Sequence, residues 1–188
     1  MIDRKSTLID IATIVAETLR QDHIDSVLVG GSAITAHDPS IYVSRDADFV
    51  AAASNAELVP PMIKLGFSRS GFNWVHPDSE YTVQFVSGAA TIGSRLVTEF
   101  EEINNANGVL KTLKLQDAIE DRLLKFIVWD DREARKIALR LIRKHAGSLD
   151  VAVLEQHLEI ESPTTDMRRK LSSVLRKIEP RPPKLGLS

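Results

Sequence analysis

Cysteine is absent from this chain of 188 residues, which excludes disulfide bridges and thiolate metal sites. Long hydrophobic runs are also lacking, because no segment approaches the roughly 20 apolar residues that a bilayer crossing requires. The first 21 residues interrupt their apolar positions with Asp10, Glu17 and Arg20, a pattern that is not typical of a secretory signal peptide. We therefore expect a cytoplasmic protein with no membrane partner.

A strong charge of one sign is lacking as well. The formal net charge is -2, so no global basic field attracts nucleic acid, although a local basic patch is compatible with this value. The five histidines show no pairing typical of a zinc site. Apolar residues make up 43% of the chain and charged residues 27%, which is the composition of a globular protein with a real hydrophobic core.

The order of predicted elements indicates a mixed α/β region followed by an all-helical region. Hydrophobic periodicity predicts helices over residues 6–21, 32–37 and 55–65, and strands over 26–29, 44–51, 67–75 and 81–86. Further helices are predicted over 115–128, 132–145, 149–158 and 165–178. We expect an α/β domain over residues 1–110, a helical subdomain over 111–180 and a flexible tail over 181–188.

The first motif is Gly30-Gly31-Ser32, which follows a predicted strand and opens a predicted helix. Glycine allows close approach of the backbone and a positive φ, and a helix N-terminus offers unpaired N–H groups to an anion. The Ser32 hydroxyl could add a contact to a phosphate oxygen. By itself such a segment is more often only a turn.

The second motif is the pair Asp46 and Asp48, which lie two positions apart in a predicted strand. Both side chains are therefore expected on one face of that strand. Two carboxylates on one face repel each other unless a cation lies between them, and oxygen ligands of this kind suit Mg²⁺. The alternative is that this face of the strand is simply in contact with water.

Together the two motifs are more specific than either alone. The stretch VLVGGSAITAHDPSIYVSRDADFV resembles the polymerase-beta-like nucleotidyltransferases. The segment from Ser44 to Asp48 is similar to their small bacterial branch, the type IV toxin or abortive-infection nucleotidyltransferases and their uncharacterised relatives. The resemblance implies a nucleotidyltransferase-like mixed β-sheet with flanking helices and a helical C-terminal region. It also implies that the Gly30–Ser32 turn binds a nucleoside triphosphate and that Asp46 and Asp48 hold a two-ion Mg²⁺ site.

Gln84 departs from the pattern of this family. The family usually places a third carboxylate on a later strand, and the best candidate strand here carries Gln84 at that position. Glutamine offers a carbonyl oxygen but has no charge and cannot act as a general base. The chain is then expected to hold a second metal ion less well. The alternative is that Gln84 is an ordinary polar residue on an exposed face.

A third set of residues lies in the segment LQDAIEDRLLKFIVWDDREARKIA. Asp121 and Lys125 are spaced for a pair on one helix face, which alone would indicate a surface salt bridge. The resemblance implies that Lys125 or Arg122 faces the triphosphate, so both are expected to bind nucleotide and Lys125 to assist catalysis. Trp129 is expected in the core rather than as a stacking platform, and Asp130 and Asp131 are expected to cap the next helix.

Three hypotheses follow for function. The preferred one is a Mg²⁺-dependent nucleotidyltransferase that acts on an RNA or protein acceptor, as part of a toxin–antitoxin pair with a cognate antitoxin or other partner protein. The second is a catalytically inactive nucleotide-binding or partner-binding module on the same fold. The third is a regulatory protein whose helical half, residues 149–178, binds a partner. An acid at position 84 would have favoured the enzyme.

Overall fold

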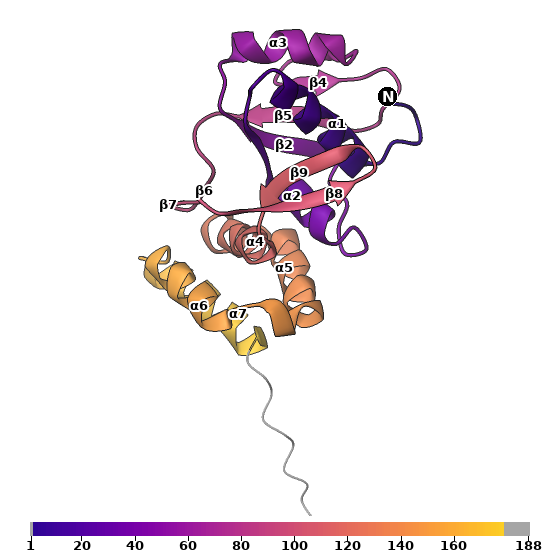
Figure 1. The fold of residues 1–188 in the computed structure, drawn as a ribbon. Helices are drawn as coiled ribbons and strands as arrows, with labels where there is room; N and C mark the ends of the chain where they lie inside the picture. The colour runs from indigo at the N-terminus through magenta and orange to yellow at the C-terminus, as the bar shows by residue number, and fades with distance from the viewer. Residues whose placement is uncertain (1, 179–188) are drawn as a thin grey trace, which may run out of the picture. The chain divides into compact units, whose positions relative to one another are not determined.

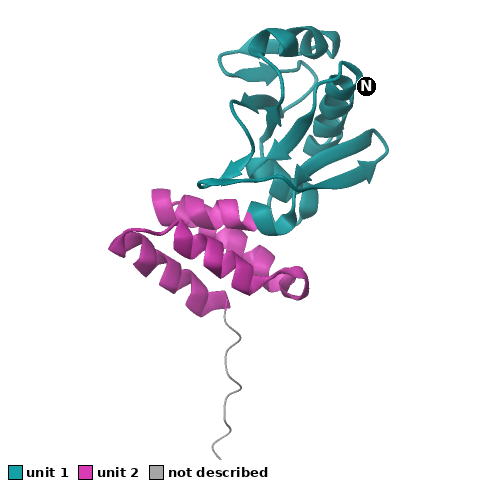
Figure 2. Ribbon diagram, turned by 60° about the vertical axis from the view of Figure 1, so that its left-hand side comes forward, with its two compact units in different colours: residues 1–118 teal, residues 119–188 magenta. Residues whose placement is uncertain are grey.

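The structure is a computed structural model that describes residues 2–178. The chain divides into two compact units, residues 1–118 and residues 119–188 (Figure 2). The expected tail, residues 181–188, lies outside the described residues. None of the helices between residues 2 and 178 combines the length and hydropathy that a membrane crossing requires.

The first unit is built on a seven-stranded mixed sheet with the order β3-β4-β5-β2-β1-β9-β8 (Figure 1). Its strands are β1 (Ser26–Val29), β2 (Asp46–Ala51), β3 (Ser68–Ser70), β4 (Asn73–Val75), β5 (Thr82–Val86), β8 (Phe100–Asn105) and β9 (Gly108–Leu113). Its helices are α1 (Leu8–Gln21), α2 (Gly30–His37) and α3 (Asn55–Lys64), and β6 (Thr91–Ile92) pairs with β7 (Arg95–Leu96). The pairs β2–β5 and β1–β9 are parallel, whereas the other pairs are antiparallel.

The second unit is entirely helical among its described residues. It contains most of α4 (Leu115–Trp129), followed by α5 (Arg132–Lys144), a short 3-10 turn (Ala146–Ser148), α6 (Val151–Ile160) and α7 (Thr165–Ile178). The mixed α/β architecture with flanking helices and helices at the C-terminal end confirms the fold class expected from the sequence.

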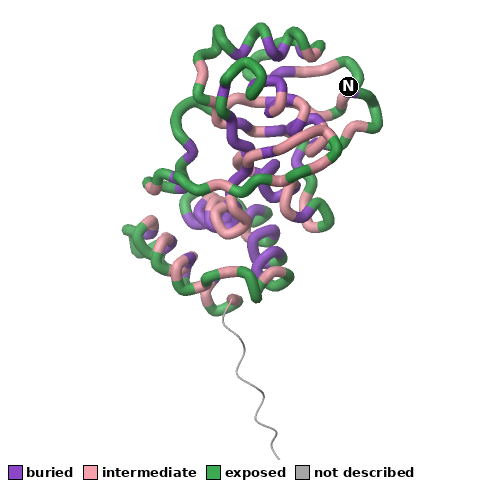
Figure 3. The backbone as a smooth tube through the Cα atoms, in the orientation of Figure 1, coloured by how far each residue is buried: buried purple, intermediate pink, exposed green. Residues whose placement is uncertain are grey.

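One face of the sheet carries the hydrophobic core of the first unit. Ile11 and Val15 of α1 pack there with Met62 of α3 and with the sheet residues Phe49 and Val83. Figure 3 marks the buried positions along the backbone of these helices and strands in purple. Because side chains alternate along a strand, burial of Ala47 and Phe49 sends Asp46 and Asp48 to the opposite face of β2.

Several boundaries differ from those expected. The strand predicted over 67–75 is a hairpin of β3 and β4, because Gly71 turns the chain with a φ of 63°. The helix predicted from Ser6 begins at Leu8 and is capped by Thr7, whose hydroxyl accepts the Asp10 N–H at 3.2 Å. The domain boundary expected at residue 110 falls inside β9, where Leu110 is fully buried in the core.

The β8–β9 hairpin was not predicted, because its first strand is polar and largely exposed. A row of polar side chains on α1 holds it: Asn105 donates to Thr13 at 2.7 Å, and Asn107 donates to Asp10 at 2.8 Å. The Glu17 carboxylate accepts the Val109 N–H at 2.7 Å and lies where a Cβ on Gly108 would stand. These contacts join residues about 90 positions apart, which local periodicity cannot reveal.

Replacing Glu17 with Gln should destabilise the protein at neutral pH by about 1 kcal/mol, because charge-assisted hydrogen bonds are stronger than neutral ones. The Val109 N–H, followed by Arg20, holds the pKa of Glu17 below its ordinary value of 4.5. The stabilisation is therefore fully present above pH 4.5 and is lost as the pH falls through the lowered folded-state value. Urea unfolding of both proteins between pH 3 and pH 7 measures this, and a difference that stays constant over this range would contradict it.

Candidate functional site

The turn between β1 and α2 is shaped by Gly30. Its φ is 63°, a conformation that favours glycine. A Cβ at this position would lie 2.7 Å from Oδ2 of Asp48, so the backbone of the turn and this carboxylate are in direct contact. The N-cap residue of α2 is Val29, whose side chain makes no capping hydrogen bond. The first N–H groups of the helix therefore receive no hydrogen bond from the side chain of their N-cap residue.

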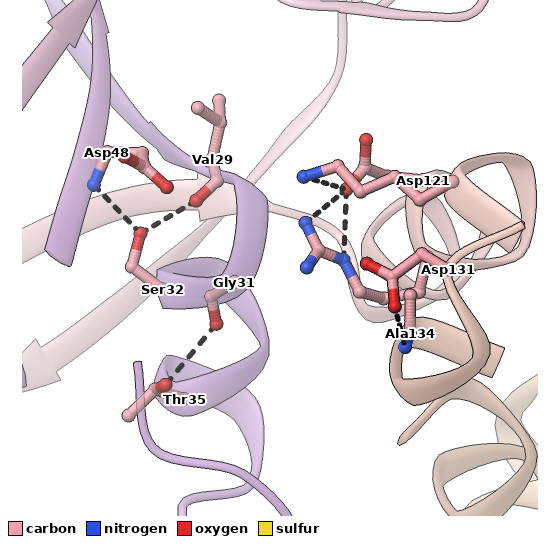
Figure 4. A network of polar contacts seen from close by, with 10 residues as sticks. Val29, Gly31, Ser32, Thr35, Asp48, Asp121, Asp131 and Ala134 are labelled. Atoms are coloured by element: carbon pink, nitrogen blue, oxygen red, sulfur yellow. Dashed lines mark hydrogen bonds and ion pairs between the residues drawn. The ribbon is translucent and has the colours of Figure 1, made fainter. Parts of the chain in front are cut away.

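Ser32 fastens this turn to β2. Its hydroxyl donates to the Val29 carbonyl at 2.7 Å and accepts the Asp48 N–H at 3.0 Å, as Figure 4 shows. The residue is fully buried. The Ser32 hydroxyl was expected to contact a phosphate. In the structure it is hydrogen-bonded to two backbone groups, the Val29 carbonyl and the Asp48 N–H. Its role in this structure is to position Asp48 beside the turn.

Asp46 and Asp48 share one face of β2, as the sequence predicted. Both are half-buried, whereas Ala47 and Phe49 between and after them are fully buried. The antiparallel register pairs Asp48 with Val29, the last residue of β1. This pairing places the acidic end of β2 next to the mouth of α2.

The neighbouring strand β5 presents neutral polar residues to the two acids. Its parallel register pairs Asp46 with Thr82 and Asp48 with Gln84. The Thr82 hydroxyl donates to Oδ1 of Asp46 at 2.6 Å. Gln84 therefore lies at the position on β5 next to Asp48, where the family resemblance implies a third acid.

The segment before β2 is tied to α2 by hydroxyl groups. Thr35 donates to the Gly31 carbonyl at 3.3 Å and accepts the Ser44 N–H at 2.9 Å. A Cβ on Gly31 would lie 3.1 Å from the Tyr42 ring and 3.3 Å from Oγ of Ser44. Gly30 is thus closely packed against Asp48, and Gly31 is closely packed against Tyr42 and Ser44.

The donor set fits one divalent cation better than two. Two carboxylates on one face, with one of them oriented by Thr82, match the hydrogen-bonded oxygen ligands that Mg²⁺ sites use. Within residues 2–178, however, no group of three or more His, Cys, Asp or Glu side chains is arranged to hold a metal ion. The residues present do not supply the three carboxylates of a two-ion centre.

The remaining predicted site residues belong to the second unit. Arg122 is buried and donates to Asp121 through Nη2 at 2.7 Å and Nε at 3.1 Å, and Lys125 approaches the same carboxylate at 3.9 Å (Figure 4). Trp129 was expected in the core, but it is 78% exposed at the end of α4. Asp131 caps α5 as predicted, accepting the Ala134 N–H at 2.9 Å.

The structure thus brings together the turn residues Gly30, Gly31 and Ser32, the two acids and Gln84 within the first unit. In the second unit, Arg122 and Lys125 both approach the carboxylate of Asp121. Sequence reasoning missed Thr82, Thr35 and Ser44. The sequence could have indicated Thr82, because this residue lies two positions before Gln84 and therefore shares its face of the strand.

Comparisons with known proteins support the fold. No protein-family model matches the chain, and no curated protein matches it. The chain is similar to the crystal structure of an antigenic nucleotidyltransferase-like protein from Paracoccidioides brasiliensis, with 12% identity and a TM-score of 0.58 over 92% of this chain and 89% of that one. It is also similar to the solution structure of the antibiotic-resistance factor ANT(2'')-Ia, with 15% identity and a TM-score of 0.49 over 89% and 94% of the two chains. The first likeness shows that the chain has a nucleotidyltransferase-like fold.

Replacing Ser32 with Ala should lower the free energy of unfolding by about 1–3 kcal/mol, because the Asp48 N–H and the Val29 carbonyl each lose a buried partner. Urea denaturation without any ligand measures this, with Ser70→Ala as the matched control at an exposed serine. A variant as stable as the wild type would show that the hydroxyl does not hold the turn.

Proposed function

We propose that the chain binds a nucleoside triphosphate with Mg²⁺ at the β1–α2 turn, Asp46 and Asp48, and transfers its nucleotidyl group to an RNA or protein acceptor. The observation that carries the proposal is the contact between Gly30 and the Asp48 carboxylate. An uncapped helix mouth attracts anions, whereas two carboxylates repel them. A phosphate can lie between the helix N-terminus and the two carboxylates only if a cation neutralises the repulsion. A nucleotide bound to Mg²⁺ brings both the phosphate and the cation.

Each element of the turn has a part in binding. The N–H groups at the start of α2 would donate to phosphate oxygens, and the absence of a side chain on Gly30 and Gly31 lets the backbone come close. Asp46 and Asp48 would hold one Mg²⁺, which would neutralise phosphate charge and orient the α-phosphorus. Thr82 keeps Asp46 in a fixed orientation through its 2.6 Å hydrogen bond.

In the transfer step, one bond to phosphorus forms and one breaks. A hydroxyl oxygen of the acceptor forms a bond to the α-phosphorus, the bond from that phosphorus to the bridging oxygen breaks, and pyrophosphate leaves. The hydroxyl proton must pass to a base. Gln84 stands beside Asp48 but cannot accept it, so the proton must go to water or to one of the two aspartates. We therefore expect slow transfer.

Gln84 also favours a second candidate function, a nucleotide-binding module that does not transfer. Binding needs only the turn and the two aspartates, which β1, α2 and β2 supply, together with one cation from solution. Transfer additionally needs the acceptor oxygen to be activated, which a third carboxylate would do. The two candidates are separated by whether pyrophosphate is released.

The remaining expectations belong to the same proposal. Arg122 and Lys125 would bind the triphosphate as cations, with Lys125 assisting catalysis. The pairing of both residues with Asp121 keeps their side chains oriented. A cognate antitoxin or other partner protein would complete the system that the resemblance implies.

Replacing Asp48 with Asn should lower Mg²⁺-dependent affinity for ATP or another triphosphate at least tenfold, because one of two anionic ligands becomes neutral while the shape is kept. Isothermal calorimetry with and without Mg²⁺ measures the change. Asp78→Asn is the matched control, since Asp78 lies in the exposed turn before β5. Equal binding by wild type and Asp48→Asn, with and without Mg²⁺, would refute the site.

Replacing Gln84 with Glu should increase nucleotidyl transfer, because a positioned general base contributes on the order of 100 to 10,000-fold. The glutamate should also lower stability without metal, since it adds a third negative charge beside Asp48, and raise Mg²⁺ affinity. Pyrophosphate release and label transfer from radioactive triphosphate to bulk RNA or protein measure the rate. A wild type that is already fast, and that the glutamate slows or leaves unchanged, would show that another group acts as base.

A further inference from the structure

Charge is distributed unevenly between the two units. Residues 1–118 contain 15 acidic and 9 basic side chains, whereas residues 119–188 contain 11 acidic and 15 basic ones. The small overall net charge of -2 therefore hides a negative first unit and a positive second unit. Local excess of one sign, rather than the total, sets the field that a charged partner meets.

Helix α5 carries six basic side chains of the second unit and α7 carries five. The α5 sequence REARKIALRLIRK contains six arginine or lysine residues and one glutamate. The apolar residues of this helix are buried: Ala134, Ile137, Ala138, Leu139, Leu141 and Ile142. Figure 3 shows α5 with a buried side and an exposed side. Packing of these residues leaves Arg132, Lys136, Arg140, Arg143 and Lys144 exposed to solvent, whereas Arg135 is half-buried over the Phe126 ring.

Four of the exposed cations form a continuous row, which we call the α5 cationic face: Arg132, Lys136, Arg140 and Arg143. At about 100° and 1.5 Å per residue, they lie within a sector of roughly 80° over about 17 Å of helix. Arg132 approaches Asp130 at 3.7 Å and Lys136 pairs with Glu133 at 2.9 Å, but all four of these side chains are more than half exposed. Such surface pairs are weak and are easily exchanged for other anions. Arg143 forms no ion pair within residues 2–178.

The composition of this face indicates its kind of partner. The centres of protein interfaces are enriched in aromatic and other apolar residues, and helices that bind membrane surfaces expose an apolar side. None of the exposed large hydrophobic residues of the described chain lies on α5. A row of cations on a helix that exposes no large apolar side chain is instead suited to a regular series of phosphates.

We propose that the α5 cationic face binds the phosphate backbone of a nucleic acid. The proposal does not depend on the nucleotide site, because it concerns only α5. If the bound nucleic acid is RNA, the same face would hold the acceptor of the transfer proposed above. Contacts are made to phosphates and not to bases, so binding is expected to depend on salt and not on sequence.

The test is fluorescence anisotropy with the full chain and two labelled 20-nucleotide oligonucleotides of the same sequence, one RNA and one DNA, without nucleotide or Mg²⁺. The variant Arg132→Gln/Lys136→Gln/Arg143→Gln removes three cations from the face. The matched control Arg4→Gln/Lys5→Gln/Lys64→Gln removes three exposed cations of the first unit. A further variant, Arg132→Lys/Arg143→Lys, keeps the charge and should bind like the wild type.

Loss of three phosphate contacts should reduce the slope of log K against log salt by about 2 and the affinity at 0.1 M salt by about 100-fold. The control variant should bind like the wild type. Equal affinity for RNA and DNA would support recognition of phosphate alone, and preference for RNA would also identify the acceptor class.

Three outcomes would overturn the proposal. They are no binding of either oligonucleotide at 20 mM salt, equal losses in the α5 variant and in the control, and binding of polyglutamate but of neither oligonucleotide. The first of these leaves the Mg²⁺-dependent nucleotide titration unaffected, so failure of this inference and failure of the nucleotide site can be distinguished. Circular dichroism of each variant checks that α5 remains helical.

Discussion

The close approach of Gly30 to the Asp48 carboxylate is the constraint on which the candidate site depends. It requires a positive φ at Gly30, antiparallel pairing of β1 with β2, and a buried Ser32 that hydrogen-bonds to the backbone of both strands. It also requires that Phe49 face the core, because only then does Asp48 face the turn. Electrostatically, the contact joins a helix mouth that attracts anions to a carboxylate that repels them.

The residues of β5 next to the two aspartates set the total negative charge of the candidate site. Thr82 and Gln84 stand opposite Asp46 and Asp48 in register, so the pair of acids has two neutral polar neighbours. The hydroxyl of Thr82 orients one acid without adding charge. Two negative charges balance one divalent cation. A second cation would need charge from the ligand itself, and a base for the acceptor would have to be found elsewhere.

The second unit has a different character. Its buried cation Arg122 donates hydrogen bonds to Asp121. Its exposed cations lie on α5 and also on α7, and both helices bury apolar residues. An acidic α/β unit and a basic helical unit within one chain present fields of opposite sign to a charged partner.

The sequence by itself determined the alternation that puts Asp46 and Asp48 on one strand face, the Gly-Gly-Ser turn at the mouth of a helix, the cap at Asp131 and the change from α/β to helix. These are local features, because strand and helix periods and capping act over a few residues. Only the tertiary structure decided that β5 lies parallel to β2 with Gln84 beside Asp48, that the Ser32 hydroxyl is buried, that Trp129 is exposed, and that a polar segment forms β8. Each of these depends on partners far away in the chain, and a hydrogen bond or a burial between distant residues leaves no periodic trace in the sequence.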